Sequence, residues 1–228
     1  MRQYKALGLA SRAGVTSAAT VSTSTLVPAL IPLSLLEAIR NLDTPVEDGL
    51  DELAEEMVVR RLGLSPTVAN QIQRYRTAAE RVGSVDLDEA VSVLRLVGRR
   101  PDAALVFADA GRRAARYATR AQRPAWTMAR SPTGGISLRL AQRAVARVAR
   151  RTFEGMLRTG PDGSEFMMDQ PLSIVALPDG AACAFYGAAF NELLRRLADF
   201  EGAMLHLRCR SRGDAVCAWH TAAAEVYE

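Results

Sequence analysis

The chain has 228 residues, 49% of them hydrophobic and 24% charged, which is the balance of a globular protein and not of a disordered one. Its formal net charge of +4 is too small to indicate nucleic-acid binding without a recognisable motif. The chain holds 3 cysteines, too few for a disulfide framework, and their odd number leaves one thiol over in any pairing.

The N-terminal residues carry bases and no acid ahead of an apolar run at 26–36. This run is too short to span a bilayer, and Pro28 and Pro32 interrupt it. We expect a flexible tail over residues 1–24 followed by a short helix; a cleaved leader peptide is the alternative. Without a transmembrane segment, and with thiols that must stay reduced to bind metal, a cytoplasmic protein is expected.

Helical periodicity dominates residues 25–100 and continues beyond them. Caps, prolines and glycines bound the helices expected at 43–62, 65–82, 86–97 and 101–121. A loop containing proline and glycine at 124–135 precedes a long amphipathic helix at 136–157.

Charge is distributed unevenly along these segments. The stretch 43–56 holds seven acidic residues and no base, whereas the stretch 110–153 holds eleven arginines and no acid. The two stretches can pair internally or across a dimer, or the basic stretch can meet an anionic ligand, a membrane surface or nucleic acid. Because the arginines lack interleaved aromatic residues, nucleic acid is the least favoured of these partners.

The periodicity changes after Gly160. Turn residues and β-branched residues predict strands at 164–168, 172–177, 204–210 and 215–221, with a helix at 181–200 between the second and the third. The fold class expected is therefore α+β, with a helix-rich N-terminal part, a small antiparallel sheet and a C-terminal hairpin. The expected organisation is a tail at 1–24, a helical region at 25–100 and a domain at 101–228.

A candidate metal site lies in the last fifth of the chain, at Cys183, His206, Cys209 and Cys217. Three thiolates and one imidazole make a closed tetrahedral zinc site, which stabilises a fold and performs no chemistry. Cys209 and Cys217 lie symmetrically about Gly213, so a hairpin turning there brings them together. The alternatives are buried cysteines that act as small hydrophobic residues, or a redox-active or catalytic thiol.

His206 is the questionable ligand of this set. It lies three residues before Cys209, and in a regular strand that offset points the two side chains to opposite faces. A bulge or an irregular strand is therefore required if His206 is to join the site. His220 has the same offset from Cys217.

The segments Cys183-Ala-Phe-Tyr-Gly-Ala-Ala-Phe-Asn-Glu-Leu-Leu and Cys209-Arg-Ser-Arg-Gly-Asp-Ala-Val-Cys217-Ala-Trp resemble the closing signature of the 4-vinyl reductase domain family. The resemblance covers roughly residues 100–222 and looks closest to the member of bacteriochlorophyll synthesis. It implies a fold akin to subunits of the vesicle-trafficking transport protein particle complex, often a homodimer, with a hydrophobic pocket. It also implies zinc held by three cysteines and a glutamate, and His206 occupies the glutamate position.

No catalytic residue can be named for a reductase. The chain has no nicotinamide or flavin motif and no phosphate-binding loop, and Lys5 is its only lysine. With only two histidines, little remains for acid–base chemistry. Reduction of a tetrapyrrole vinyl group in (bacterio)chlorophyll synthesis therefore stays the alternative function, beside that of a dimeric scaffold subunit.

The function expected first is binding of a small hydrophobic molecule, a tetrapyrrole or another hydrocarbon, by a carrier, sensor or accessory factor. Simple core packing is the alternative role of the aromatic and methionine residues that could line the pocket. These candidates are Phe107, Tyr117, Trp126, Met128, Phe153, Phe185, Tyr186 and Phe190. Arg139, Arg143 and Arg147 could pair with the carboxylates of a tetrapyrrole, or they could form a solvated helix face.

Overall fold

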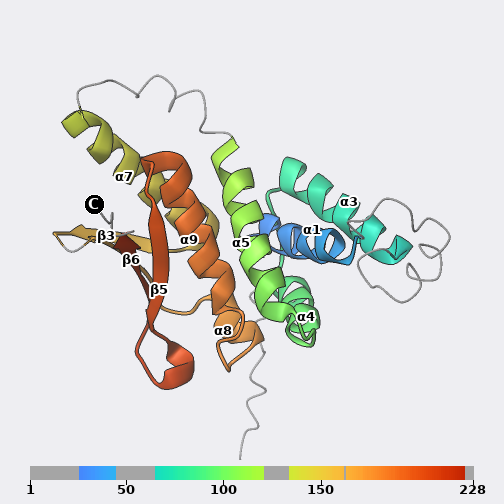
Figure 1. Cartoon of the computed structure of the whole chain (residues 1–228). Coiled ribbons are helices and arrows are strands. Elements are labelled where there is room, and N and C mark those ends of the chain that lie inside the picture. The colour runs from blue at the N-terminus through green and yellow to red at the C-terminus, as the bar shows by residue number, and fades with distance from the viewer. Residues whose placement is uncertain (1–25, 45–64, 121–133, 162, 224–228) are drawn as a thin grey trace, which may run out of the picture.

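The computed structural model describes residues 26–44, 65–120, 134–161 and 163–223. Within these ranges it has seven α-helices, a two-stranded antiparallel sheet and a four-stranded antiparallel sheet, so the α+β class is confirmed. The larger sheet lies at one side of the molecule, and the N-terminal helices lie at the other (Figure 1). None of the helices in the described ranges is both long enough and apolar enough to cross a bilayer.

The N-terminal part is built around helix α1 (Leu30–Asp43), which is buried along most of its length. Strand β1 (Leu26–Pro28) precedes it and pairs with β2 (Ser84–Asp86). Pro32 is tolerated in α1 because it lies in the first turn, where the backbone N–H groups have no partner within the helix. The short helix expected after residue 24 is therefore present, while β1 and β2 were not predicted.

Three further helices follow their sequence signals. Helix α3 (Pro66–Arg81) begins at Ser65, whose hydroxyl accepts a hydrogen bond from the Val68 N–H at 3.3 Å. Helices α4 (Leu87–Gly98) and α5 (Ala103–Arg120) occupy the stretches predicted for them. The predicted helix at 43–62 lies almost wholly outside the described residues.

Two predictions after residue 134 are corrected by the structure. Helix α7 (Gly134–Phe153) ends before residue 157, because Glu154 has a φ of 58° and strand β3 (Met156–Gly160) begins two residues later. The stretch 172–177 forms helix α8 (Leu172–Ala176) and not a strand. Strand β4 (Gly163–Met168) is present as predicted and pairs with β3.

The C-terminal part consists of helix α9 (Cys183–Ala198), strand β5 (Gly202–Arg208), the short 3-10 helix η2 (Arg210–Arg212) and strand β6 (Cys217–Ala223). The strand order in the sheet is β3-β4-β6-β5, so the C-terminal hairpin forms one half of it. Helix α9 lies between this sheet and α5, as Figure 1 shows.

Aromatic packing joins α9 to the sheet. The rings of Phe190 on α9 and Phe166 on β4 stack at 4.2 Å, and Trp219 on β6 contacts Phe190 edge-on. The same hydrophobic core continues through α5 to α1 and α4, across residues 25–100 and 101–223 alike. Movement of α9 would therefore disturb both ends of the molecule.

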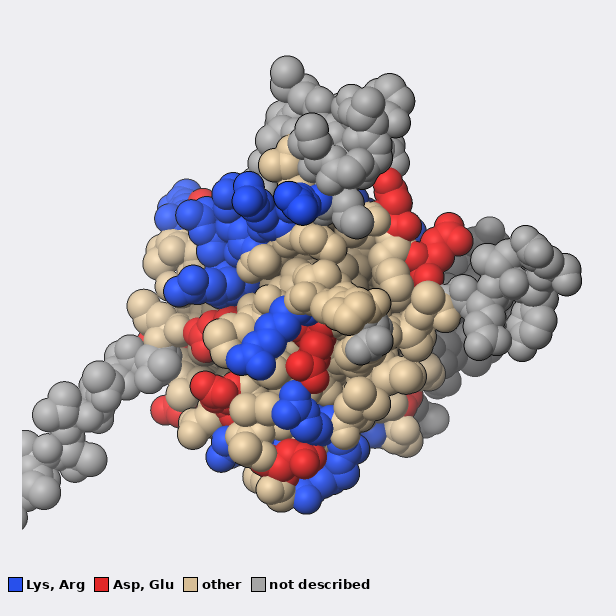
Figure 2. All heavy atoms as spheres, turned by 90° about the vertical axis from the view of Figure 1, so that its left-hand side faces the viewer, with Lys and Arg blue, Asp and Glu red and all other residues tan. Residues whose placement is uncertain are grey.

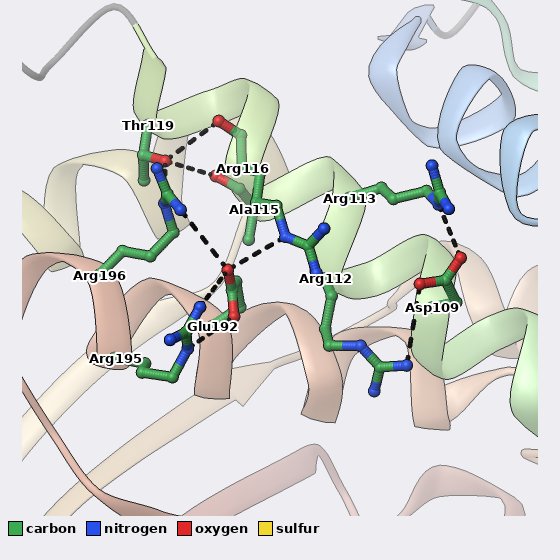
Figure 3. A network of polar contacts seen from close by, with 9 residues as sticks. All are labelled: Asp109, Arg112, Arg113, Ala115, Arg116, Thr119, Glu192, Arg195 and Arg196. Carbon is green, nitrogen blue, oxygen red and sulfur yellow. Dashed lines mark hydrogen bonds and ion pairs between the residues drawn. The ribbon is translucent and has the colours of Figure 1, made fainter.

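A buried carboxylate fixes the contact between α5 and α9 (Figure 3). Glu192 on α9 is only 4% exposed; it accepts hydrogen bonds from Arg195 at 2.9 Å and from Arg116 on α5 at 3.2 Å. Burial raises the pKa of Glu192, but these bonds from Arg195 and Arg116 outweigh it and hold the pKa below 4.5. The stabilisation is therefore present at neutral pH and is lost as the pH falls through this depressed pKa.

Glu192→Gln is expected to lower the free energy of unfolding at pH 7 by roughly 2–3 kcal/mol, because it leaves neighbouring arginines without their shared carboxylate. The matched control is Glu165→Gln, which removes a more exposed ion pair with Arg208 and should cost less than about 1 kcal/mol. Urea unfolding at pH 7 and at pH 4 measures how much each variant lowers the free energy of unfolding relative to the unmodified protein. Equal losses at pH 7 would contradict the structural role given to Glu192.

Candidate metal centre

Three elements bring the four predicted metal ligands together. Cys183 is the first residue of α9, His206 lies in β5, Cys209 directly follows β5, and Cys217 is the first residue of β6. One ligand atom from each of these residues lies within 4.8 Å of the other three. The Sγ atom of Cys209 is 4.0 Å from that of Cys183 and 3.9 Å from that of Cys217.

A break in strand register places His206 in this group. The pairing of β5 with β6 shifts between His206 and Arg208, which is the irregularity that the sequence offset required. The imidazole stacks on the Trp219 ring at 4.7 Å with an angle of 8° between the planes. Its Nε2 atom is buried and has no hydrogen-bond partner in the described part of the chain, so a buried acceptor is left for a metal ion.

The spacing of the sulfur atoms fits a tetrahedral ion. With zinc–sulfur bonds of about 2.3 Å, two sulfur ligands of a tetrahedral site lie about 3.8 Å apart. The observed separations of 3.9 and 4.0 Å are close to this value and far longer than a disulfide bond. All three cysteines are free thiols.

Two serine hydroxyls lie within hydrogen-bonding distance of the sulfur atoms of Cys183 and Cys209. The Ser211 hydroxyl lies 3.0 Å from the Sγ of Cys209, and the Ser173 hydroxyl lies 3.3 Å from that of Cys183. Such contacts orient thiolate ligands and stabilise their negative charge. Sequence reasoning missed both serines: the Cys-x-Ser spacing could have indicated Ser211, whereas Ser173 lies on α8, which was predicted as a strand.

The turn between Cys209 and Cys217 is held by hydrogen bonds among its own residues. Gly213 has a φ of +90°, a left-handed conformation that favours glycine. The Asp214 carboxylate accepts a hydrogen bond from the Cys209 N–H at 2.7 Å, so this side chain helps to set the geometry of the turn. His220 takes no part in the cluster; its Nδ1 lies 2.8 Å from the carbonyl oxygen of Thr221.

Burial sets the protonation of the metal-free site. It raises the pKa of the Cys183 thiol to about 12 and also raises that of Cys217. At Cys209 burial acts in the same direction, but hydrogen bonds from Ser211 outweigh it and lower the pKa. Burial lowers the pKa of His206, so its ring is neutral and able to bind metal at pH 7. Metal binding must then release protons, and affinity falls as the pH falls.

A separate apolar cavity of about 340 Å³ lies where β1 and α1 meet the end of α7, α8 and α9. Most of its lining is apolar, and the polar side chains in it include Glu154 and Gln170. The lining residues are Val27, Pro28, Ile31, Leu87, Thr152, Phe153, Glu154, Met168, Gln170, Leu172, Val175 and Tyr186.

Of the predicted pocket residues that the structure describes, only Phe153 and Tyr186 line this cavity. Phe107, Phe185 and Phe190 are packed in the core, where they are at most 1% exposed. Tyr117 lies elsewhere, and its hydroxyl donates a hydrogen bond to Glu37 at 2.6 Å. The other two candidates, Trp126 and Met128, lie outside the described residues.

The predicted arginine stripe also lies away from the cavity. Arg139, Arg143 and Arg147 are exposed on α7, and none of them lines the apolar cavity. Arg147 instead borders a shallow surface hollow with Ala146, Arg150 and Arg151. The cavity thus lacks the arginines that were expected to hold the carboxylates of a tetrapyrrole.

In comparisons with known proteins, no family, no curated protein and no solved structure matches the chain significantly. The resemblance to the 4-vinyl reductase domain therefore rests on the sequence segments quoted above. Because a fold does not determine a function, the site geometry must carry any functional conclusion.

Proposed function

We propose that this protein binds a small hydrophobic molecule and that a structural zinc ion fixes one wall of the binding site. The observation that carries the proposal is the cavity of about 340 Å³ with its largely apolar lining. Its volume lies at the lower end of the range for ligand pockets, which typically combine apolar walls with a few polar groups. A carrier, sensor or accessory factor would use such a site without performing chemistry.

The size of the cavity favours a compact ligand. A cavity of roughly 150 Å³ takes one benzene ring, so 340 Å³ corresponds to about two rings or a short hydrocarbon chain. A tetrapyrrole macrocycle would have to protrude, and its carboxylates would find no arginine among the described lining residues. We therefore infer a hydrocarbon-like ligand in preference to a tetrapyrrole.

Zinc would be held by the three cysteine sulfurs and by His206. It would supply a fixed link between the start of α9 and the β5–β6 hairpin, because four protein ligands leave no coordination position open. Cys183 and Tyr186 lie one turn apart on α9, and Tyr186 lines the cavity. The same link would therefore hold one wall of the cavity in place.

Binding of naphthalene, a neutral fluorescent hydrocarbon of two fused rings, tests the cavity. Val175→Trp places a large side chain at its lining and should weaken probe binding by at least about tenfold, measured by fluorescence titration. The control is Val82→Trp, at an exposed position outside the lining, which should bind the probe like the unmodified protein. Equal affinities of the two variants, or equal losses, would contradict a role for this cavity.

A further inference from the structure

Helix α7 presents a face formed by five exposed arginines. Arg139, Arg143, Arg147, Arg150 and Arg151 are all exposed, while Ala141, Val145, Val148, Ala149 and Phe153 on the same helix are buried. At about 100° per residue, the five arginines fall within an arc of about 120°. We call this surface the α7 arginine face. Figure 2 shows basic side chains gathered at the upper part of the side of the molecule on which α7 lies.

No carboxylate neutralises this face within the part of the chain that the structure describes: none of its five arginines forms an ion pair there. Arginines elsewhere do pair: Arg100 binds Asp43 and Asp102, and Arg113 binds Asp109. Three guanidinium groups of the face, on Arg147, Arg150 and Arg151, border the surface hollow around Ala146. Positive charge is therefore concentrated here, and no carboxylate of the described residues neutralises it.

We propose that the α7 arginine face docks the protein on the surface of an anionic phospholipid bilayer. From Arg139 to Arg151 it extends about 18 Å along a straight helix, so it can meet several phosphate groups lying in one plane. One guanidinium group can donate two parallel hydrogen bonds to the oxygens of one phosphate group, so arginine is a preferred residue for binding phosphate. Leu140 lies within the same arc and is 43% exposed, which suits contact with the interfacial layer of a membrane.

The exposed surface fits a bilayer better than a nucleic acid. Among the described residues, the exposed large hydrophobic side chains are all aliphatic, so a platform for base stacking is missing. Sequence readout in a groove combines arginine with amide and hydroxyl side chains, whereas the charged and polar residues of this arc are all arginines. A surface of this kind recognises negative charge density and not base sequence.

Flotation of the full chain with phospholipid vesicles tests the proposal. We expect binding to phosphatidylcholine vesicles that contain phosphatidylglycerol, no binding to phosphatidylcholine alone, and release by high salt. Each arginine at an anionic surface contributes a factor of roughly five. Arg143→Gln, Arg147→Gln and Arg150→Gln combined should therefore reduce partitioning about 100-fold.

The matched control changes three other exposed arginines, Arg40, Arg81 and Arg99, to glutamine. These residues lie on or next to α1, α3 and α4, at the opposite side of the molecule from α7 (Figure 1), and form no ion pair in the described chain. The control carries the same charge change and should bind vesicles nearly like the unmodified protein. Circular dichroism of both triple variants verifies that they fold.

Three results would overturn the proposal. The first is vesicle binding that the two triple variants lose equally, because net charge and not this face would then be responsible. The second is binding of random duplex DNA that depends on the α7 arginines, without vesicle binding. The third is the absence of vesicle binding together with a fall in oligomer mass of the α7 variant in light scattering, which would identify a second copy of the chain as the partner.

Discussion

Cys217→Ser is expected to abolish zinc binding and to destabilise the C-terminal sheet severely. Cys217 is fully buried and begins β6, so its loss removes both a ligand and the link from β6 to α9. Structural zinc contributes many kcal/mol of folding energy in small metal-binding domains. In a chain of this size about 1 kcal/mol shifts Tm by roughly 2–4 °C, so the fall in Tm should exceed about 10 °C.

Metal analysis of protein purified without chelator, combined with thermal unfolding, measures this effect. The unmodified chain should carry one zinc ion and lose stability when a strong chelator removes it, whereas Cys217→Ser should carry almost none. If the unmodified protein is fully stable without any metal, the cluster is a set of buried thiols that pack as hydrophobic residues. This result would remove zinc from the proposed function, but it would not contradict ligand binding in the cavity.

Substitution of each of the two histidines tests whether His206 is the fourth zinc ligand, with His220 as the control. His206→Gln should weaken zinc binding by more than about 100-fold, because it removes an imidazole whose buried Nε2 atom has no hydrogen-bond partner among the described residues. His220→Gln should have little effect on affinity, since its ring lies outside the cluster and contacts Thr221. Competition with a chromophoric chelator measures both affinities, and equal values would exclude His206 as a ligand.

The members of the candidate metal site could be predicted because residue type alone restricts them. All the cysteines and histidines of the chain fall in its last fifth, so few combinations were available. The register shift beside His206 could not be predicted, because it arises from the pairing of β5 with β6. The lining of the cavity could not be predicted either, because it comes from segments far apart in the sequence: β1, the ends of α7 and β4, α8 and α9. Several of the aromatic residues that were predicted to line it are packed in the core instead.

The helices were predicted well where a local signal bounds them, as Ser65 and Pro66 do for α3. Strands β1 and β2 have only three residues each, and Leu26 pairs with Asp86, so their structure depends on a distant partner. The stretch 172–177 contains Ile174 and Val175, which favour a strand. The five-residue helix α8 forms there nevertheless, because its packing against α4 and α9 outweighs this weak propensity.

The crossing of α5 over α9 depends on Gly111, and Gly111→Ala is expected to lower the free energy of unfolding by about 3 kcal/mol. An added Cβ would overlap the carbonyl oxygen of Phe185 and lie 3.0 Å from the backbone nitrogen of Ala189. Both atoms belong to the α9 backbone and cannot rotate away, so the two helices would have to separate. The gain in helix propensity from glycine to alanine, about 1 kcal/mol, is too small to offset this.

Urea unfolding measures the loss, and Gly160→Ala is the control, because no atom lies within 4 Å of a Cβ added there. This control should change stability by less than about 1 kcal/mol. Similar stabilities of the two variants would show that α5 and α9 can move apart at little cost.

Phe185 and Ala189 face α5, whereas Cys183 and Phe190 face the sheet and the candidate metal centre. Gly111→Ala should therefore still bind one zinc ion, because it disturbs the face of α9 that lies opposite the ligands.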